Sequence, residues 1–131
     1  MQKLLGLDVG TVRIGIAVAD DLLKIAHPIT TINASEGAIA EIIGIKEQQR
    51  AHMIVIGLPR NSKGEETAQS QYSRDFATEL QRQGVEVAFQ DESLTSVTAE
   101  ERLQTRKKPY TKADIDAEAA TIILQDYLDQ L

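Results

Sequence analysis

The chain contains no cysteine and no tryptophan, and it has only three prolines and two histidines among 131 residues. The lack of cysteine excludes disulfides and thiolate metal sites, so any bound metal must be held mainly by oxygen. No apolar run approaches the roughly 18 residues of a membrane span, and no charged-then-apolar leader follows Met1. We therefore expect a cytoplasmic protein without a membrane partner, in which carboxylates are the metal ligands to look for.

Basic residues are outnumbered by acidic ones, 14 to 20, which gives a net charge of −6 and a pI near 4.9. Nucleic-acid binding depends on neutralising phosphates, so this balance argues against a protein that binds nucleic acid over its whole surface. Two local basic stretches remain, one with Arg60 and Lys63 around a loop. The other comprises Arg102, Arg106, Lys107, Lys108 and Lys112. Such a run alone is typical of a solvated helix end.

The pattern of apolar residues predicts one compact α/β domain over residues 1–131, because a composition that is 42% hydrophobic can bury a single core. Strands are expected over 3–9, 13–19, 25–32, 53–59 and 85–92, and helices over 35–50, 65–83, 95–106 and 111–128. The first two strands form a hairpin, and Pro28 favours an edge position for the third. Together the elements predict a five-stranded mixed sheet flanked by helices.

Glycines and apolar repeats inside these elements carry further expectations. Gly6 and Gly15 lie within the first two strands, where they indicate either the close approach of another backbone or a bend. The second helix repeats apolar side chains every four residues and is followed by Gly84. Its predicted core stripe is Ala68, Tyr72, Phe76 and Leu80.

Three acids stand out by their position. Asp8 lies near the end of the first strand and Glu92 ends the fifth, and strand ends are where open α/β sheets bind ligands. Asp116 falls on the apolar stripe of the last helix, whereas Asp114 and Glu118 are expected to project from its far side as surface acids. No lysine or arginine shares the Asp116 face of that helix. A buried carboxylate there needs a proton or a cation.

Convergence of these three acids would raise at least one pKa unless divalent ions neutralised them. Mg²⁺ or Mn²⁺ suits oxygen-only ligation, and a pair of such ions can activate water and stabilise the leaving oxygen of a phosphodiester. The acids together therefore indicate phosphodiester hydrolysis with a two-metal mechanism. Taken singly, each has a simpler role: Asp8 as a turn acceptor, Glu92 at a helix start, and Asp116 in a partly solvated first turn.

Four ordered blocks of the chain resemble the YqgF family, also called RuvX. They read LGLDVGTVRIGIAVAD, VIGLPRNSKGEETAQSQYSRDFATEL, QDESLTSVTAEERL and IDAEAATIILQDYL, and the resemblance covers residues 3–128. It implies the RNase H-like fold of RuvC-type resolvases and other metal-dependent nucleases. It also implies that Asp8, Glu92 and Asp116 are the metal-binding and catalytic acids.

Several further positions match motifs expected near nucleic acid. Thr11 belongs to the first block, Arg60 and Asn61 to the GLPRN loop, and Thr95 to the acidic block. The basic side chains expected to hold the strand are Arg60, Lys63, Arg102, Arg106, Lys107, Lys108 and Lys112. The chain has Ser93 where the family commonly has arginine, and Ser96 where threonine is usual, so a backbone contact from that arginine is not carried over.

The resemblance implies a nuclease that processes the 5′ end of precursor 16S ribosomal RNA, a structured RNA. No exposed apolar stripe in the sequence demands a stable dimer, so we expect a monomer or weak homodimer. The alternative is a Holliday junction resolvase acting on branched DNA, which needs two symmetric sites and hence a stable dimer. Two other interpretations stay open. The DVGT motif resembles the phosphate loop of actin-like ATPases, but those need a second lobe. A non-catalytic RNase H-like binding module would not need all three acids.

Overall fold

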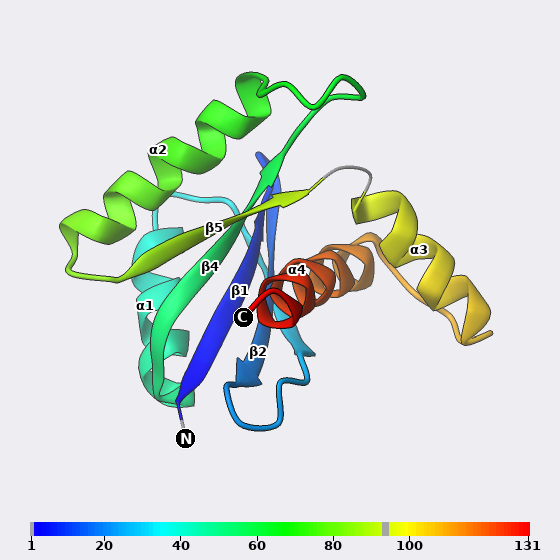
Figure 1. Ribbon diagram of the computed structural model, residues 1–131, viewed down its shortest axis with the longest axis horizontal. Helices are drawn as coiled ribbons and strands as arrows, with labels where there is room; N and C mark the ends of the chain where they lie inside the picture. Colours follow the sequence, from blue (N-terminus) through cyan, green and yellow to red (C-terminus); the bar gives the residue numbers. More distant parts are fainter. Residues whose placement is uncertain (1, 93–94) are drawn as a thin grey trace.

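The computed structural model describes residues 2–92 and 95–131, with only the backbone for residues 95–97, and its five strands form one mixed sheet (Figure 1). The strands are β1 (Lys3–Val9), β2 (Arg13–Asp20), β3 (His27–Asn33), β4 (Ala51–Pro59) and β5 (Val87–Glu92), in the spatial order β3-β2-β1-β4-β5. β1, β2 and β3 pair antiparallel, whereas β1, β4 and β5 run parallel. The predicted mixed sheet, the first hairpin and the edge position of β3 are confirmed.

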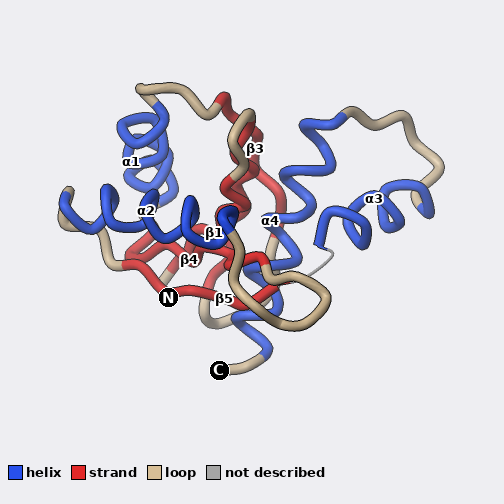
Figure 2. Tube along the Cα trace, turned by 90° about the horizontal axis from the view of Figure 1, so that it is seen from above, coloured by secondary structure: helices blue, strands red, loops and turns tan. Residues whose placement is uncertain are grey.

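Helices cover both faces of this sheet. α1 (Ala38–Gln49) and α2 (Ala68–Arg82) pack on one face, and α4 (Lys112–Asp129) packs on the other. α3 (Thr95–Thr105) lies on the outer side of α4, which stands between it and the strands (Figure 2). The four helices begin and end within three residues of their predicted bounds. In the described part of the chain, none combines the length and the hydropathy that a bilayer span requires.

The buried stripe of α2 differs from the prediction. Ala68 is exposed, and Tyr72 and Phe76 are only partly buried against the core. The fully buried positions are Ser70, Ser73, Ala77 and Leu80. The stripe is rotated because the Ser70 hydroxyl points inward at the start of the helix, where it donates to the Pro59 carbonyl and accepts from the Thr67 N–H. Apolar spacing alone could not show this polar anchor.

Glycines in the strands let α4 lie close to the sheet. A Cβ added to Gly6 would be 2.7 Å from Leu124 Cβ, and one added to Gly15 would be 1.9 Å from the carbonyl oxygen of Asp116. Both separations are shorter than real Cβ contacts. Close approach of another backbone, one of the two roles predicted for these glycines, is therefore the one found, and the approaching element is α4.

Candidate active site

A cleft of about 360 Å³ opens at the carboxyl ends of β1 and β4, and both Asp8 and Asp116 line it. Asp8 comes from β1 and Asp116 from the second turn of α4. In the hairpin Asp8 pairs with Gly15, the residue against which the Asp116 backbone rests. The missing side chain of Gly15 therefore lets the two acids meet. The other lining residues are Val9, Gly10, Thr11, Val12, Arg13, Pro59 and Gln69.

The two acids are in different electrostatic settings. Burial, and then repulsion by the charge of Asp116, raises the pKa of Asp8 from its usual 3.8 to about 6, because both effects disfavour the ionised form. Asp116 has a cationic partner, since Arg13 Nε donates a hydrogen bond to Asp116 Oδ2 over 2.5 Å. With two carboxylates and one guanidinium, the cleft is short of positive charge.

Arg13 corrects an expectation drawn from the sequence. Lys112 begins α4 four residues before Asp116 and so lies on the same face of the helix, contrary to the prediction. The cation that pairs with Asp116 is nevertheless Arg13 of β2, 103 residues away. This pair depends on the packing of α4 across β2, which helical periodicity does not reveal. One signal does exist, because side chains two apart in a strand share a face. Arg13 precedes Gly15 by two residues, and Gly15 is where α4 approaches.

Glu92 ends β5 at the same edge of the sheet but on another strand. It lies four residues after Ala88, which packs with the α4 side of the core, so it shares that face. β4 separates β5 from β1, which places these two strands about 10 Å apart. Glu92 does not line the cleft, and the described residues contain no group of three His, Cys, Asp or Glu side chains able to hold a metal. The structure brings Asp8 and Asp116 together in this cleft, and the participation of Glu92 as a third acid stays a prediction.

The Asp8–Asp116 pair still has the donor chemistry that a divalent cation requires. Mg²⁺ is commonly held by one or two carboxylates, with water and substrate phosphate completing its coordination. The raised pKa of Asp8 indicates that a second negative charge in the cleft is costly. A divalent ion would remove that cost, because its charge inverts the local preference for the protonated acid. The residues present therefore fit Mg²⁺ or Mn²⁺.

Two hydrogen bonds fix the end of β1 and the turn after it, whose residues line the cleft. The Gly10 N–H donates to the Arg13 carbonyl over 3.0 Å and closes the turn between β1 and β2. Gln69 of α2 donates through Nε2 to the Val9 carbonyl over 2.9 Å, which ties the end of β1 to that helix. Thr11 is exposed at the turn and lines the cleft. No sequence signal pointed to Gln69, because its role depends on a contact 60 residues away.

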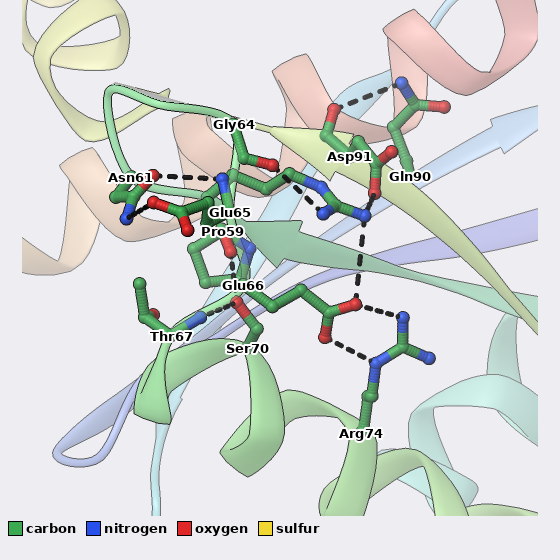
Figure 3. A network of polar contacts seen from close by, with 11 residues as sticks. Pro59, Asn61, Gly64, Glu65, Glu66, Thr67, Ser70, Arg74, Gln90 and Asp91 are labelled. Atoms are coloured by element: carbon green, nitrogen blue, oxygen red, sulfur yellow. Dashed lines mark hydrogen bonds and ion pairs between the residues drawn. The ribbon is translucent and has the colours of Figure 1, made fainter.

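Arg60 and Asn61 shape the loop between β4 and α2, whose polar network is drawn in Figure 3. Arg60 Nη2 donates to Asp91 Oδ1 over 3.1 Å, and its Nη1 donates to the Gly64 carbonyl over 3.2 Å. Asn61 Oδ1 accepts from the N–H groups of residues 63 and 65, each over 2.9 Å. Both side chains are thus engaged within the protein, while Lys63 is exposed. Contact of these three residues with nucleic acid stays a prediction.

Glu118 is buried, which shows that its prediction as a surface acid was wrong. Its side chain is 2% exposed, and its Oε1 lies 3.0 Å from Arg102 Nη2 and 3.4 Å from Arg106 Nη2. The reason is that α3 covers the outer side of α4. Asp114 is exposed, as predicted, and exchanges capping hydrogen bonds with Thr111. Arg102 and Arg106 therefore bind α3 to α4, with 44% and 49% of their side chains exposed.

The turn from α3 to α4 presents the remaining basic residues. Lys107, Lys108 and Lys112 are all exposed. Lys108 also lines a second cleft, of about 250 Å³, together with Tyr110. The Tyr110 hydroxyl donates to Glu100 and anchors the turn, the role favoured over base stacking. Thr95 begins α3, but its side chain lies outside the described residues, as do Ser93 and the Ser96 side chain.

Comparison with known proteins identifies the family. A family model described as "RuvX: Holliday junction resolvase" matches residues 2–130. The chain belongs to the RuvX family. One RuvX relative, from Sulfurihydrogenibium sp. (strain YO3AOP1), is 40% identical over 100% of this chain and 92% of its own length. Another, from Chloroflexus aurantiacus (strain ATCC 29366 / DSM 635 / J-10-fl), is 44% identical over 98% of this chain and 87% of its own length. Both are named "Putative pre-16S rRNA nuclease".

Solved structures identify the fold of this RuvX chain. It is similar to T. thermophilus RuvC in complex with a Holliday junction substrate, with a TM-score of 0.59 and 16% identity over 99% of this chain and 95% of that one. A second Thermus thermophilus RuvC structure matches with a TM-score of 0.55 and 13% identity, over 98% of this chain and 95% of that chain. The RuvC-type, RNase H-like fold implied by the sequence resemblance is thus confirmed.

Proposed function

We propose that this chain is a divalent-metal-dependent nuclease that hydrolyses phosphodiester bonds at the 5′ end of precursor 16S rRNA in the cytoplasm. The observation that carries this proposal is the meeting of Asp8 and Asp116 in one cleft that also contains the exposed Thr11. Membership of the RuvX family and the names of its relatives support the choice of reaction and substrate.

In this proposal Asp8 and Asp116 hold Mg²⁺ or Mn²⁺, and Glu92 is the third candidate ligand because it faces the same side of the sheet at the same edge. The bound ions would lower the pKa of the attacking water and stabilise the leaving oxygen. The protein's own contribution is positional. Gly15 lets Asp116 approach Asp8, and Gln69 fixes the end of β1 that carries Asp8.

The RNA strand would be held by local basic residues, since the whole protein carries a charge of −6. Among the expected binding residues, Lys63, Lys107, Lys108 and Lys112 are exposed. Arg60, Asn61, Arg102 and Arg106 have hydrogen bonds or ion pairs within the protein and would contribute through the parts that remain exposed. Thr11 would contact the backbone from the cleft itself.

A second candidate function, the cleavage of Holliday junctions, is favoured by the description of the matching family as a Holliday junction resolvase. It makes a separate structural demand, because a four-way junction is cut at two symmetric positions. The active protein would then be a two-fold symmetric dimer.

The experiment compares two labelled substrates, a 5′ fragment of precursor 16S rRNA and a four-way DNA junction, each with Mn²⁺ and with EDTA. The proposal expects a Mn²⁺-dependent cut in the RNA that is lost in Asp8→Asn and in Asp116→Asn. Asp75→Asn is the matched control, since this exposed acid hydrogen-bonds Gln71 within α2. Cutting of the junction alone would favour the second candidate. Binding without cutting of either substrate would indicate a non-catalytic module.

A further inference from the structure

Arg13 is the only positively charged residue among the described residues that line the Asp8–Asp116 cleft. Its side chain is 33% exposed, and its Nε donates to Asp116 Oδ2 over 2.5 Å. A guanidinium has five N–H donors in a planar fork, of which this bond uses one. Within the part of the chain that the structure describes, no acceptor is hydrogen-bonded to the Nη groups of Arg13. Four donors are therefore available to a ligand in the cleft.

We propose that Arg13 binds a backbone phosphate of the nucleic-acid substrate through its Nη groups while its Nε remains on Asp116. The ion pair with Asp116 fixes the plane of the guanidinium before the substrate arrives, which lowers the ordering cost of binding. A planar fork also matches two phosphate oxygens better than a single ammonium does. This inference rests on the proposed function, and it assigns the side chain that receives the substrate phosphate beside the acids.

The charge of the cleft supports this assignment. A phosphodiester that enters between Asp8 and Asp116 adds a third negative charge to a partly buried site, which is unfavourable without a nearby cation. The arginines of the other basic stretches are engaged elsewhere, Arg60 with Asp91 and Arg102 with Glu118. Neither lines this cleft. Arg13 is therefore the protein's own positive charge at the place where the phosphate must lie.

The test measures RNA binding without metal and without cleavage. Fluorescence anisotropy in EDTA gives the Kd of the 5′ fragment of precursor 16S rRNA over a range of salt concentrations, for Asp8→Asn and for Asp8→Asn/Arg13→Gln. Asp8→Asn prevents cleavage and removes one anion from the cleft. Loss of one charge-assisted phosphate contact should weaken binding about tenfold. It should also reduce the slope of log K against log salt by about 0.7 to 0.9.

Arg82→Gln in the same Asp8→Asn background is the matched control. Arg82 is exposed on α2 and pairs with Glu79, so the change in net charge is the same at a site away from the cleft. Its affinity should stay within about twofold of the Asp8→Asn protein, as expected for one distant, screened charge. Equal affinities and equal salt slopes for the Arg13 and Arg82 variants would overturn the proposal.

Arg13→Lys separates phosphate binding from simple neutralisation of Asp116. It keeps the charge but lacks the fork that bonds Asp116 and phosphate together, so binding should weaken with little change in salt slope. Unchanged affinity would overturn the proposal, and this variant decides the matter if Arg13→Gln does not fold. Because binding is measured in EDTA, a protein that never cuts RNA could still show the Arg13 dependence. The two proposals can thus fail separately.

Discussion

Gly15 lies directly against the backbone of Asp116, so that a Cβ on Gly15 would be 1.9 Å from the Asp116 carbonyl oxygen. Gly15 also pairs with Asp8 across the β1–β2 hairpin. This single contact therefore sets the position of one acid relative to the other. The cleft depends on the lack of a side chain in β2 as much as on the acids themselves.

Gly15→Ala should destabilise the fold and impair the site together. The methyl group meets backbone rather than a flexible side chain, so α4 must move away from β2. Overpacking of this kind costs about 1 to 3 kcal/mol, and the severity of this clash points to the upper end. Urea unfolding measures the loss. Gly44→Ala is the control, because nothing lies within 4 Å of its added Cβ in α1. The Gly44→Ala change should raise the free energy of unfolding by about 0.5 to 1 kcal/mol. If Gly15→Ala and Gly44→Ala instead lowered it by the same amount, the explanation from the contact with α4 would be contradicted.

The elements and the position of Asp116 were predictable because they depend on local periodicity. Asp116 lies on a stripe that one helix defines by itself. Glu118 was misplaced because a helical wheel does not show that a second helix, α3, covers the outer side of α4. The wheel correctly showed one apolar face but gave no information about the opposite one.

The partners of the acids were not predictable for a related reason. Arg13 reaches Asp116 only when β2 and α4 are packed together, and β4 lies between the strands that carry Asp8 and Glu92. Both facts depend on strand order and on long-range packing. Strand-end position predicts the same edge for Asp8 and Glu92, but it does not decide which side chains line one cleft.

The stability of the metal-free protein should fall as the pH rises. The folded pKa of Asp8 is about 6, above its usual value of 3.8, so the folded state holds this proton more tightly. That contribution is fully present below about pH 3.8 and is lost as the pH rises through 6. A shift of about two units corresponds to at most about 3 kcal/mol. In EDTA at pH 8, Asp8→Asn should therefore be more stable than the parent, and the gap should close towards pH 4. Parallel pH profiles of unfolding would contradict this.

Mn²⁺ should reverse that order of stability. An ion that binds only the folded parent raises its free energy of unfolding by about 2.7 kcal/mol at a concentration 100 times its Kd. Asp8→Asn lacks one of the two carboxylates that share the cleft, so it should gain much less. Thermal melting with and without Mn²⁺ measures both. Asp75→Asn, which changes an acid on α2, should respond like the parent. An equal gain in Asp8→Asn would show that the ion binds elsewhere.

Glu118→Gln should loosen α3 from α4. Removal of one partner from a buried ion pair costs about 3 to 5 kcal/mol, and the half-exposed arginines reduce the expected loss to about 2 kcal/mol. Glu101→Gln is the control, since Glu101 is exposed on α3. Urea unfolding compares the two variants, and hydrogen exchange of α3 amides reports where the loosening occurs. Equal stability of both variants would mean that the Glu118 ion pairs do not hold α3.

The lysines of the α3–α4 turn should affect RNA binding without affecting the fold, unlike the arginines beside them. Lys108 and Lys112 are exposed, whereas Arg102 and Arg106 bind Glu118. If both lysines contact phosphates, Lys108→Ala/Lys112→Ala should lower the slope of log K against log salt by about 1.4 to 1.8. The urea midpoint of the double lysine variant should stay unchanged, whereas Arg102→Ala/Arg106→Ala should unfold at a lower urea concentration.

The matched control for the lysine pair is Lys46→Ala/Arg82→Ala, which removes the same charge from the helices on the opposite face of the sheet. Net charge alone would weaken binding equally in both double variants. A steeper loss in the turn variant would therefore place the RNA near the α3–α4 turn, because screening confines such effects to about 10 Å at 0.1 M salt. Identical salt slopes would remove this turn from the interface and leave the Asp8–Asp116 cleft to account for RNA binding.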